Sequence, residues 1–482
     1  MDYLKRYPQI FISLICIACY LPFANIGFLS DDFTFLQHYQ SECWGMISSN
    51  FYDAFFIPVT HIIQLILLDV FNQNAFLIHI TQIILHYYIA VLIYRIALEN
   101  LNFKPYSAIL SSIFFILIPY QSEAVFWFSS IGYQCCLMLT LVAIRSYFKN
   151  QILSYCLFFI LSIHSKEIGY TTPIFIYAFS YFAKEKKKNL YLLYSFLIVI
   201  LSLISRYLVL GELVGGYGEI THLNFQLTSI LKVIGGYFIK FFSFSRYATS
   251  SGLLITQCLL IISILTPIIL HLIKNRKFNK MGLWLFIFCI CILPVINLEI
   301  TSINMIQSDR YGYFASVPIV LFFGSAVSFL RNKIKIIVTV LSISMFFFMT
   351  ILNNQKWIGA SLLAENYLSE LSKVLSHEKK VFLINVPDNF KGVYVLRNGV
   401  RDYLSMKNIE TEIYIWKFQT FKQLNGGIQF RDKTLKEYNT DTYFEKYSSN
   451  LSDFISNCDL ILYYNNFTFN KIDKLSFTIN KN

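Results

Sequence analysis

The feature that most constrains this chain is a series of apolar stretches, many close to 20 residues long, separated by short polar segments. A helix needs about 20 predominantly apolar residues to cross the hydrocarbon core of a bilayer, and residues 10–29 and 189–210 are stretches of this kind. Charged residues make up only 14% of the 482 positions, against about a quarter in a typical soluble chain. The sequence therefore predicts an integral membrane protein with many helices.

The apolar pattern predicts about eleven membrane-spanning helices. They are expected over residues 8–29, 75–95, 106–119, 133–148, 150–164, 169–184, 189–210, 251–273, 281–298, 312–330 and 333–352. The first follows Lys5-Arg6 and runs directly into Ser30, with no small-x-small cleavage site, so we interpret it as a retained span. Shorter spans such as 150–164 need neighbouring helices to complete the depth of the bilayer.

Lysine and arginine are distributed unevenly between alternate loops, and this asymmetry predicts the orientation of the chain. With the N-terminus inside, seventeen fall in inside segments: Lys5, Arg6, Arg95, Lys104, Arg145, Lys149, Lys184, Lys186, Lys187, Lys188, Lys274, Arg276, Lys277, Lys280, Arg331, Lys333 and Lys335. Five fall in outside segments: Lys166, Lys232, Lys240, Arg246 and Arg310. We therefore expect a cytoplasmic N-terminus and an extracytoplasmic tail. The absence of eukaryotic appendages such as TPR repeats suggests a bacterial inner membrane as the setting.

The chain changes character after residue 352. Short alternating runs at 381–384, 412–416 and 460–464 predict strands, and residues 393–404 fit a helix. We expect an all-α polytopic membrane domain over 1–352 and a small extracytoplasmic α/β domain over 353–482. The net charge of +12 is accounted for by cytoplasmic loops and a lysine-rich tail, so no nucleic-acid partner is expected.

Two long outer loops, about 30–74 and 211–250, complete the predicted topology. The first contains no lysine or arginine, and both contain apolar or amphipathic stretches, such as 62–68 and 227–244. Such stretches favour helices that lie along the membrane surface. For 227–244 a re-entrant helix is the alternative, whereas a full span would reverse the later orientation and weaken the charge asymmetry.

Two adjacent acids, Asp31 and Asp32, lie just outside the first predicted span. One of them could take the proton of an acceptor hydroxyl as a general base, or the two could ligate a divalent metal such as Mg²⁺ or Mn²⁺. A loop that merely avoids positive charge would contain the same residues, and we regard this reading as equally plausible from the pair alone.

Cations from distant parts of the chain are expected on the same outer face. Arginine and lysine suit a phosphate group, because a guanidinium can hold its oxygens in a fork, and the candidates are Lys166, Arg206, Arg246 and Arg310. The alternative is that they pair with nearby acids such as Glu167 and Asp309, or with the head groups of membrane lipids.

Other polar residues are expected to shape the site. Glu123, His164, Glu167 and Asp309 all fall in outer turns of the predicted topology. His86 shares one face of the span 75–95 with His79 and Gln82. Hydrogen bonding between helices is the main expectation for these three residues, and a role of His86 near donor or acceptor is the second.

Six short segments, taken in order, resemble the membrane part of GT-C glycosyltransferases. They are Ser30-Asp31-Asp32, Pro119-x-x-x-Glu123-Ala124-Val125-x-Trp127, Ser165-Lys166-Glu167-x-Gly169-x-x-x-Pro173, Leu293-Pro294-x-x-Asn297-Leu298, Asp309-Arg310-Tyr311-x-Tyr313-x-x-Ser316-Val317 and Asn354-x-x-Trp357. The likeness covers residues 1–357 and is greatest to the O-mannosyltransferase-like group, whose eukaryotic members carry TPR repeats.

The resemblance implies transfer of a sugar from a polyprenyl-phosphate donor outside the cytoplasm, with Asp31 or Asp32 as the base. A single displacement of the lipid phosphate predicts inversion at the sugar. The acceptor would be a glycan, a lipid or a protein. The chain departs from the pattern where Ser129-Ser130-Ile131-Gly132 replaces an arginine that often follows Trp127, and where Asp309 stands in place of a glutamate. No TPR array follows, so the protein acceptors of the eukaryotic relatives are not implied.

Two other functions fit a chain of this composition. A transporter or flippase for a lipid-linked saccharide would place ionisable residues near the middle of the membrane and would show matching halves with broken helices. A non-catalytic membrane subunit would bind partners through its tail and would tolerate the loss of Asp31 and Asp32. The one-sided distribution of polar residues favours the enzyme over the transporter.

Overall fold

The computed structural model describes residues 7–47, 55–185, 189–211, 227–242, 278–295, 308–375, 380–418, 458–465 and 467–472, with isolated residues between 261 and 273. The chain divides into two compact units. Unit 1 comprises residues 1–25 and 42–355, and unit 2 comprises residues 26–41 and 356–482. We expected the segment 26–41 in the membrane domain, but it belongs to the same compact unit as residues 356–482.

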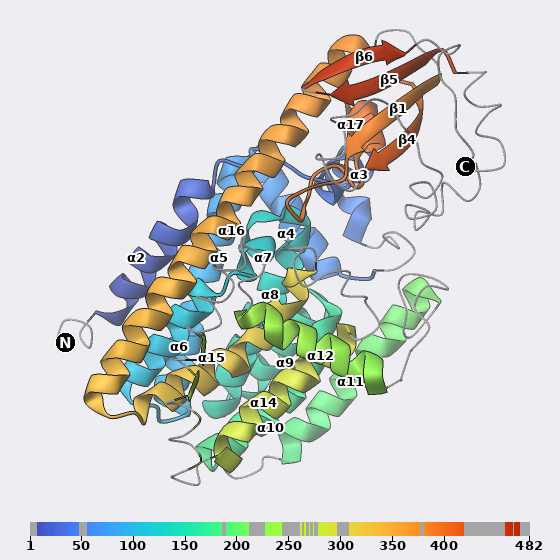
Figure 1. Cartoon of the computed structure of the whole chain (residues 1–482). Coiled ribbons are helices and arrows are strands. Elements are labelled where there is room, and N and C mark those ends of the chain that lie inside the picture. The colour runs from blue at the N-terminus through green and yellow to red at the C-terminus, as the bar shows by residue number, and fades with distance from the viewer. Residues whose placement is uncertain are drawn as a thin grey trace. The chain divides into compact units, whose positions relative to one another are not determined.

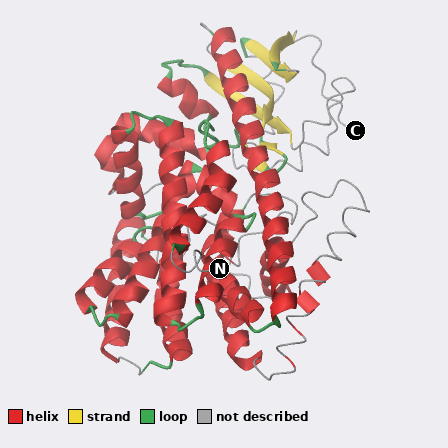
Figure 2. Cartoon of the chain, turned by 90° about the vertical axis from the view of Figure 1, so that its left-hand side faces the viewer, coloured by secondary structure: helices red, strands yellow, loops and turns green. Residues whose placement is uncertain are grey.

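Unit 1 is helical throughout its described residues, and Figures 1 and 2 show its helices side by side. The longer helices are α2 (Pro8–Tyr20), α4 (Pro58–Val70), α5 (Ala75–Arg95), α6 (Pro105–Leu117), α8 (Ile131–Phe148), α9 (Ile152–Ile163), α10 (Thr172–Ala183), α11 (Asn189–Leu210), α12 (Leu227–Phe242), α14 (Phe278–Ile292) and α15 (Gly312–Ser328). Short helical segments connect them: η1 (Leu21–Phe23), η2 (Cys43–Ile47), η3 (Ile96–Asn100), α7 (Gln121–Phe126), η4 (Phe128–Ser130), η5 (Glu167–Thr171), η7 (Leu293–Val295) and η8 (Asp309–Tyr311).

Within the described ranges, five helical segments are long and apolar enough to cross a membrane: Ala75–Asn100, Phe128–Phe148, Asn189–Leu210, Asp309–Ser328 and Asn332–Val374. Other apolar helices, such as α9, are shorter. The bounds expected at 75–95 and 189–210 coincide with α5 and α11. Most of the expected span 251–273 lies outside the described residues. The structure thus supports a helical membrane protein, while the number of eleven spans stays a prediction.

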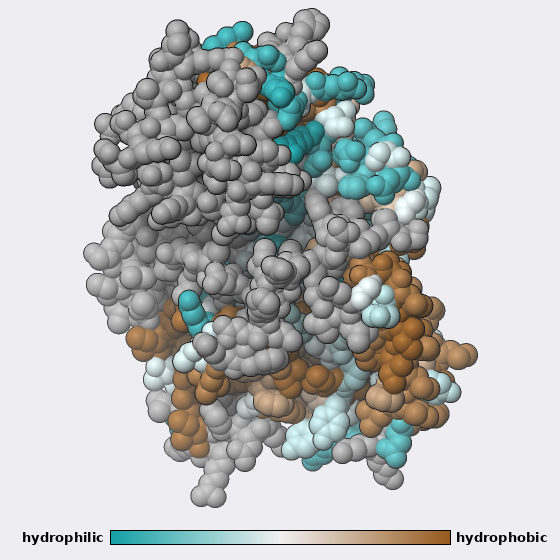
Figure 3. All heavy atoms as spheres, turned by 90° about the vertical axis from the view of Figure 1, so that its right-hand side faces the viewer, coloured by the Kyte–Doolittle hydropathy of each residue, from teal (hydrophilic) through white to brown (hydrophobic). Residues whose placement is uncertain are grey.

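Helix α11 exposes an apolar surface of the kind that lipid covers. Only 22% of the most apolar 18-residue stretch of this helix is buried. Its side chains Leu193, Leu201 and Leu208 are 54%, 65% and 77% exposed. Apolar side chains also gather over part of the face drawn in Figure 3. Apolar surface of this extent is unfavourable in water and marks contact with a membrane or another protein.

Helices α6 and α15 approach closely through small side chains. The hydroxyl of Ser107 donates to the carbonyl of Gly324 at 2.8 Å. A Cβ at Gly324 would lie 2.7 Å from the carbonyl oxygen of Ser107 and would overlap the hydroxyl of Ser111. Small residues let helix backbones approach in membranes, so this contact requires glycine.

Buried amides tie the helices of unit 1 together. Asn354 Nδ2 donates to the carbonyl of Cys19 at 2.8 Å, and Asn354 Oδ1 accepts from the hydroxyl of Ser122 at 2.6 Å. Asn353 Nδ2 donates to the carbonyl of Pro119 at 2.7 Å. These bonds satisfy carbonyls where α2 and α6 end and the chain turns. They explain why an asparagine stands at the head of the motif Asn354-x-x-Trp357.

Unit 2 contains a four-stranded sheet in the order β4-β1-β5-β6. Its strands are β1 (Lys380–Pro387), β4 (Glu412–Phe418), β5 (Leu460–Asn465) and β6 (Thr468–Ile472), and α17 (Val400–Met406) connects β1 to β4. Strands β4 and β5 pair parallel with β1, and β6 pairs antiparallel with β5. The strands expected at 381–384, 412–416 and 460–464 lie within β1, β4 and β5. The chain between β4 and β5 lies largely outside the described residues.

The helix expected over 393–404 is wrong in its first half. Residues 389–390 and 393–394 form a small hairpin, β2 (Asn389–Phe390) with β3 (Val393–Tyr394), and α17 begins only at Val400. Gly399 precedes α17 with a φ of 90°, a left-handed conformation that interrupts any helix arriving from upstream.

Helix α16 (Asn332–Val374) is a single helix of 43 residues. At 1.5 Å per residue it is about 65 Å long, roughly twice the thickness of a hydrocarbon core. Its C-terminal part belongs to unit 2, where the ring of Tyr367 packs against Tyr464 and Phe469 of the sheet. The span expected at 333–352 is therefore only the first half of a continuous helix.

Candidate functional site

The turn between α9 and η5 holds two of the predicted site residues, His164 and Glu167. Helix α4 braces this turn from the side. The backbone N–H of Val59 donates to the carbonyl of His164 at 3.1 Å. The hydroxyl of Thr60 donates to the backbone carbonyl of Ser165 at 2.6 Å. These bonds fix the turn independently of its charged side chains.

Glu167 lies between two cations. Its Oε2 is 3.3 Å from Lys166 Nζ, and its Oε1 is 3.2 Å from Arg206 Nη1, which comes from α11. Burial raises the pKa of the Glu167 carboxyl, but Lys166 and Arg206 together lower it more, so the pKa lies below its usual value. Among the described side chains, two cations therefore meet at one carboxylate.

Aromatic rings cover the ammonium group of Lys166. Its Nζ is 4.3 Å from the ring centroid of Phe55 and 5.4 Å from that of Tyr133. Rings at these distances attract a cation through their negative faces. In the same turn, burial lowers the pKa of the His164 imidazole.

A second ion pair joins Glu123 of α7 to Arg310 of η8. Glu123 Oε1 is 2.6 Å from Arg310 Nη1, and its Oε2 accepts from the backbone N–H of Arg310, also at 2.6 Å. The guanidinium carbon lies 4.6 Å from the ring centroids of both Trp127 and Tyr311. Burial raises the pKa of the Glu123 carboxyl, and Arg310 limits that rise.

A third pair, Lys240 with Asp309, is fully buried. Lys240 Nζ is 2.8 Å from Asp309 Oδ1, and neither side chain is exposed. One turn away on the same helix, the hydroxyl of Tyr237 donates to the carbonyl of Ser308 at 2.9 Å. Helix α12 is therefore joined to η8 by an ion pair and a hydrogen bond.

Tyr133 connects the first two ion-pair groups. Its ring is 5.4 Å from Lys166 Nζ, and it makes an edge contact with Tyr311 at 5.8 Å between centroids. The three groups together contain four cations and three carboxylates: Lys166, Arg206, Lys240 and Arg310 with Glu123, Glu167 and Asp309. Ion pairs and aromatic rings thus bring these seven side chains into one part of unit 1. We name these seven residues the cation cluster.

The two predicted acids lie in unit 2, at the start of α3 (Asp31–Glu42). Asp31 is partly exposed, and its Oδ1 accepts from Asn398 Nδ2 at 2.6 Å. Asp32 is fully buried, and its Oδ2 accepts from the backbone N–H of Leu29 at 3.0 Å. The two carboxylates, adjacent in sequence, are therefore in different environments.

The structure brings together most, but not all, of the predicted residues. Lys166, Arg206, Arg310, Glu123, Glu167 and Asp309 meet in the cation cluster, with His164 in its supporting turn. Arg246 lies outside the described residues. His86 is buried, and its Nδ1 bonds to the hydroxyl of Tyr313 at 2.8 Å. Gln82 Nε2 donates to the carbonyl of Trp127 at 3.1 Å, so this face of α5 does make the expected bonds between helices.

Several residues of these sites are not among the site residues predicted from the sequence. Lys240 had a signal, because a lysine within an apolar helix is costly unless it is paired. Tyr133 and Phe55 had none, since aromatic residues are frequent throughout this chain, at 18% of all positions. Asn398 had none either, because its partner Asp31 lies 367 positions away.

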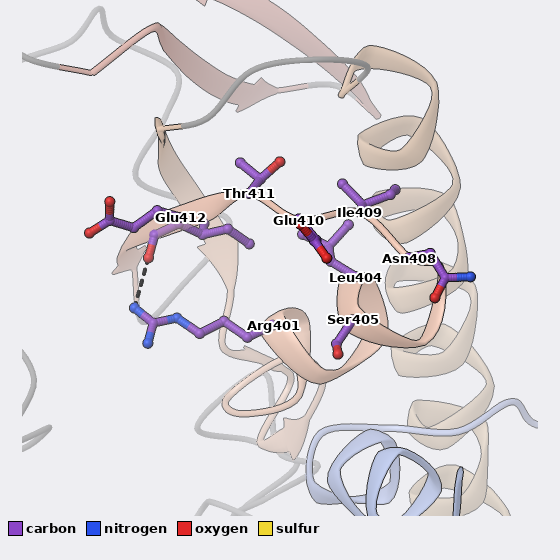
Figure 4. Close-up of a pocket in the computed structure, with 9 residues that line it drawn as sticks. Arg401, Leu404, Ser405, Asn408, Ile409, Glu410, Thr411 and Glu412 are labelled. Carbon is purple, nitrogen blue, oxygen red and sulfur yellow. Dashed lines mark hydrogen bonds between the residues drawn. The ribbon is translucent and has the colours of Figure 1, made fainter. Parts of the chain in front are cut away.

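A polar hollow opens on unit 2 between α17 and β4, away from any predicted site residue. Its lining includes Arg401, Ser405, Asn408, Glu410 and Thr411. Figure 4 shows the guanidinium of Arg401 directed at the strand, where it donates to the carbonyl of Ile413 at 2.7 Å. This arginine thus joins α17 to β4.

A metal centre at Asp31 and Asp32 is not favoured by their surroundings. Each carboxylate accepts an N–H donor, from Asn398 and from Leu29, whereas a divalent ion needs several oxygen ligands directed at one point. Over the described ranges, no three His, Cys, Asp or Glu side chains come close enough to hold a metal ion.

Comparison with protein-family models, curated proteins and solved structures finds no match to this chain. The functional assignment therefore rests on the side chains themselves. These are the cation cluster in unit 1 and a partly exposed carboxylate in unit 2.

Proposed function

We propose that this chain is a membrane glycosyltransferase that moves a sugar from a polyprenyl-phosphate donor to an acceptor outside the cytoplasm. The acceptor is a glycan, a lipid or a protein of the cell envelope. The observation that carries the proposal is the meeting of two cations, Lys166 and Arg206, at the single carboxylate of Glu167. This group lies beside apolar helices, where a lipid-linked anion would meet it.

The charge of the cation cluster suits the leaving group of such a reaction. A sugar phosphodiester carries one negative charge, and the lipid phosphate that leaves carries up to two. Fixed cations near that oxygen stabilise the transition state more than the ground state, which is the requirement for acceleration. Lys166, Arg206 and Arg310 are the residues to which we assign this role, and Glu123, Glu167 and Asp309 hold them in place.

The proton of the acceptor hydroxyl goes to a carboxylate of the pair Asp31 and Asp32. The acceptor oxygen bonds to the anomeric carbon while the bond from that carbon to the phosphate oxygen breaks. Attack from the face opposite the leaving phosphate inverts the configuration in a single displacement. No step is assigned to a metal ion.

The setting follows from the loop charges. Lysine and arginine concentrate in alternate loops, as they do on the cytoplasmic side of membrane proteins. This distribution supports an outward-facing first loop and tail. The apolar helices support an integral location in contact with membrane lipids. We assign a bacterial inner membrane because the sequence shows no TPR array of the eukaryotic kind.

Transfer from synthetic polyprenyl-phosphate hexoses, measured in nanodiscs, tests the proposal. The wild type is compared with Asp31→Asn, Asp32→Asn and Arg206→Gln, each at matched expression and folding. Arg145→Gln is the matched control for Arg206→Gln, because Arg145 also pairs with a glutamate, Glu99, at 2.6 Å but outside the cation cluster. We expect the loss of one acid to abolish transfer, and Arg206→Gln to reduce it by about 10²-fold.

Other outcomes would point elsewhere. Transfer that survives both acid substitutions would remove the proposed mechanism. No transfer from any donor, together with movement of a lipid-linked saccharide across the bilayer, would establish the transporter instead. Equal effects of Arg206→Gln and Arg145→Gln would show that the cation cluster is only structural.

A further inference from the structure

The two neighbouring acids are not equivalent within unit 2. Asp32 is fully buried, and its carboxylate reaches back to the N–H of Leu29, just ahead of α3. Such a contact stabilises the start of a helix. Asp31 is partly exposed. Its Oδ1 accepts hydrogen bonds from two side chains, from Asn398 Nδ2 at 2.6 Å and from the Ser30 hydroxyl at 3.4 Å. Of the two, only Asp31 is accessible to a substrate hydroxyl.

Asn398 comes from the loop that follows β1. This loop, residues 388–399, leaves the carboxyl end of a central strand whose neighbours β4 and β5 are both parallel to it. In open sheets with parallel strands, ligands bind at the carboxyl ends, where connections leave in opposite directions. Here the segment Ser30–Asp31 packs against that loop and forms hydrogen bonds with it.

Several bonds hold this segment against the loop. The backbone N–H of Ser30 donates to the carbonyl of Val395 at 2.9 Å, and the N–H of Asn398 donates to the hydroxyl of Ser30 at 3.3 Å. A Cβ at Gly399 would overlap the carbonyl oxygen of Ser30, so the approach needs a glycine. The geometry of Asp31 is therefore set by the tail rather than by its own helix alone.

We infer that Asn398 is a positioning residue for Asp31, and that through it the tail determines which of the two acids serves as the base. The inference rests on the proposed function and deepens it. The amide N–H orients one carboxylate oxygen, Oδ1, and leaves Oδ2 directed at the acceptor. The tail domain is accordingly part of the catalytic machinery.

Substitution of Asn398 tests this role in the full chain, with the same transfer assay. Asn398→Ala removes the donor and should lower kcat about 10-fold, and Asn398→Asp should lower it about 100-fold, because a misoriented reacting group costs rate of this order. The KM for the lipid donor should stay unchanged in both. A purely structural role would instead lower the melting temperature without lowering the kcat of the molecules that remain folded.

The chain offers a matched control in the same loop. Asn389 Nδ2 donates to the carboxylate of Asp388 at 3.3 Å, so Asn389→Asp also places two carboxylates side by side. Its melting temperature should fall like that of Asn398→Asp, while its kcat stays near the wild-type value. Should Asn398→Asp not fold, the kcat and donor KM of Asn398→Ala decide the matter.

The inference would be overturned if Asn398→Ala kept wild-type kcat, or if Asn389→Asp lost as much activity as Asn398→Asp. These results require that the wild type transfers sugar and that Asp31→Asn does not. A wild type without transfer would instead refute the proposed function, and loss of activity in Asp32→Asn alone would assign the base to the other acid.

Discussion

Removal of one partner from the buried pair Lys240 and Asp309 should destabilise the protein strongly. Both side chains are fully buried, with 2.8 Å between Lys240 Nζ and Asp309 Oδ1. Asp309→Asn keeps the shape of the side chain but leaves the ammonium group without its carboxylate. We expect a cost of about 3–5 kcal/mol, because a buried charge then loses the partner that offset its desolvation.

The matching double substitution should recover most of this loss. Lys240→Met together with Asp309→Asn removes both charges and retains an apolar chain of similar length. A buried pair exchanged for uncharged groups of similar volume is often nearly neutral, so the double variant should lie within about 1 kcal/mol of the wild type. Glu370→Gln is the control, since it breaks an exposed pair with Lys373, and should cost less than about 1 kcal/mol.

Thermal unfolding in one detergent, followed by circular dichroism, measures these differences. At about 2 °C per kcal/mol for a unit of this size, Asp309→Asn should lower the midpoint by roughly 6–10 °C. The reasoning fails if Asp309→Asn shifts the midpoint no more than Glu370→Gln, or if Lys240→Met makes Asp309→Asn worse.

Three further predictions concern packing and pH. Gly324→Ala should lower the melting temperature strongly, whereas Gly282→Ala, with open space around its Cβ, should leave it within about 2 °C of the wild type. Because the folded pKa of Glu167 is lowered, its stabilisation is present above the unfolded pKa of about 4.3 and is lost as pH falls through the lower folded value. The difference in melting temperature between wild type and Glu167→Gln should therefore shrink below pH 4, and a constant difference would contradict this. Gly399→Ala should reduce protease resistance of the first outer loop, while Gly211→Ala, at a positive φ without a clash, should not.

The sequence predicts the elements of this fold well where local chemistry decides them. Helices α5 and α11 have the expected bounds because apolar residues end sharply at polar ones. The end of α16 was missed for a related reason: polarity begins at Asn353, but residues 355–374 are rich in helix formers such as Ala, Leu, Glu and Lys, so the helix continues. Polarity there indicates where the apolar stretch ends and does not indicate where the helix ends.

The candidate site could be predicted as a set of residues but not as a set of pairs. Ionisable residues near apolar helices are costly, so their presence indicated a function or a partner. Which partner each one has depends on contacts such as Glu123 with Arg310, which are 187 positions apart. The different environments of Asp31 and Asp32 could not be predicted either, because they depend on a loop of the distant tail.

The bond between Asp31 and Asn398 also has a consequence for how the protein is made. The first outer loop is synthesised early, but its partner follows 367 residues later. At about 5–20 residues per second, roughly 20–70 s pass before that partner leaves the ribosome. During this interval Asp31 lacks the amide that orients it. If Asp31 is the base, as we propose, a chain that stops before the tail would insert into the membrane without sugar-transfer activity.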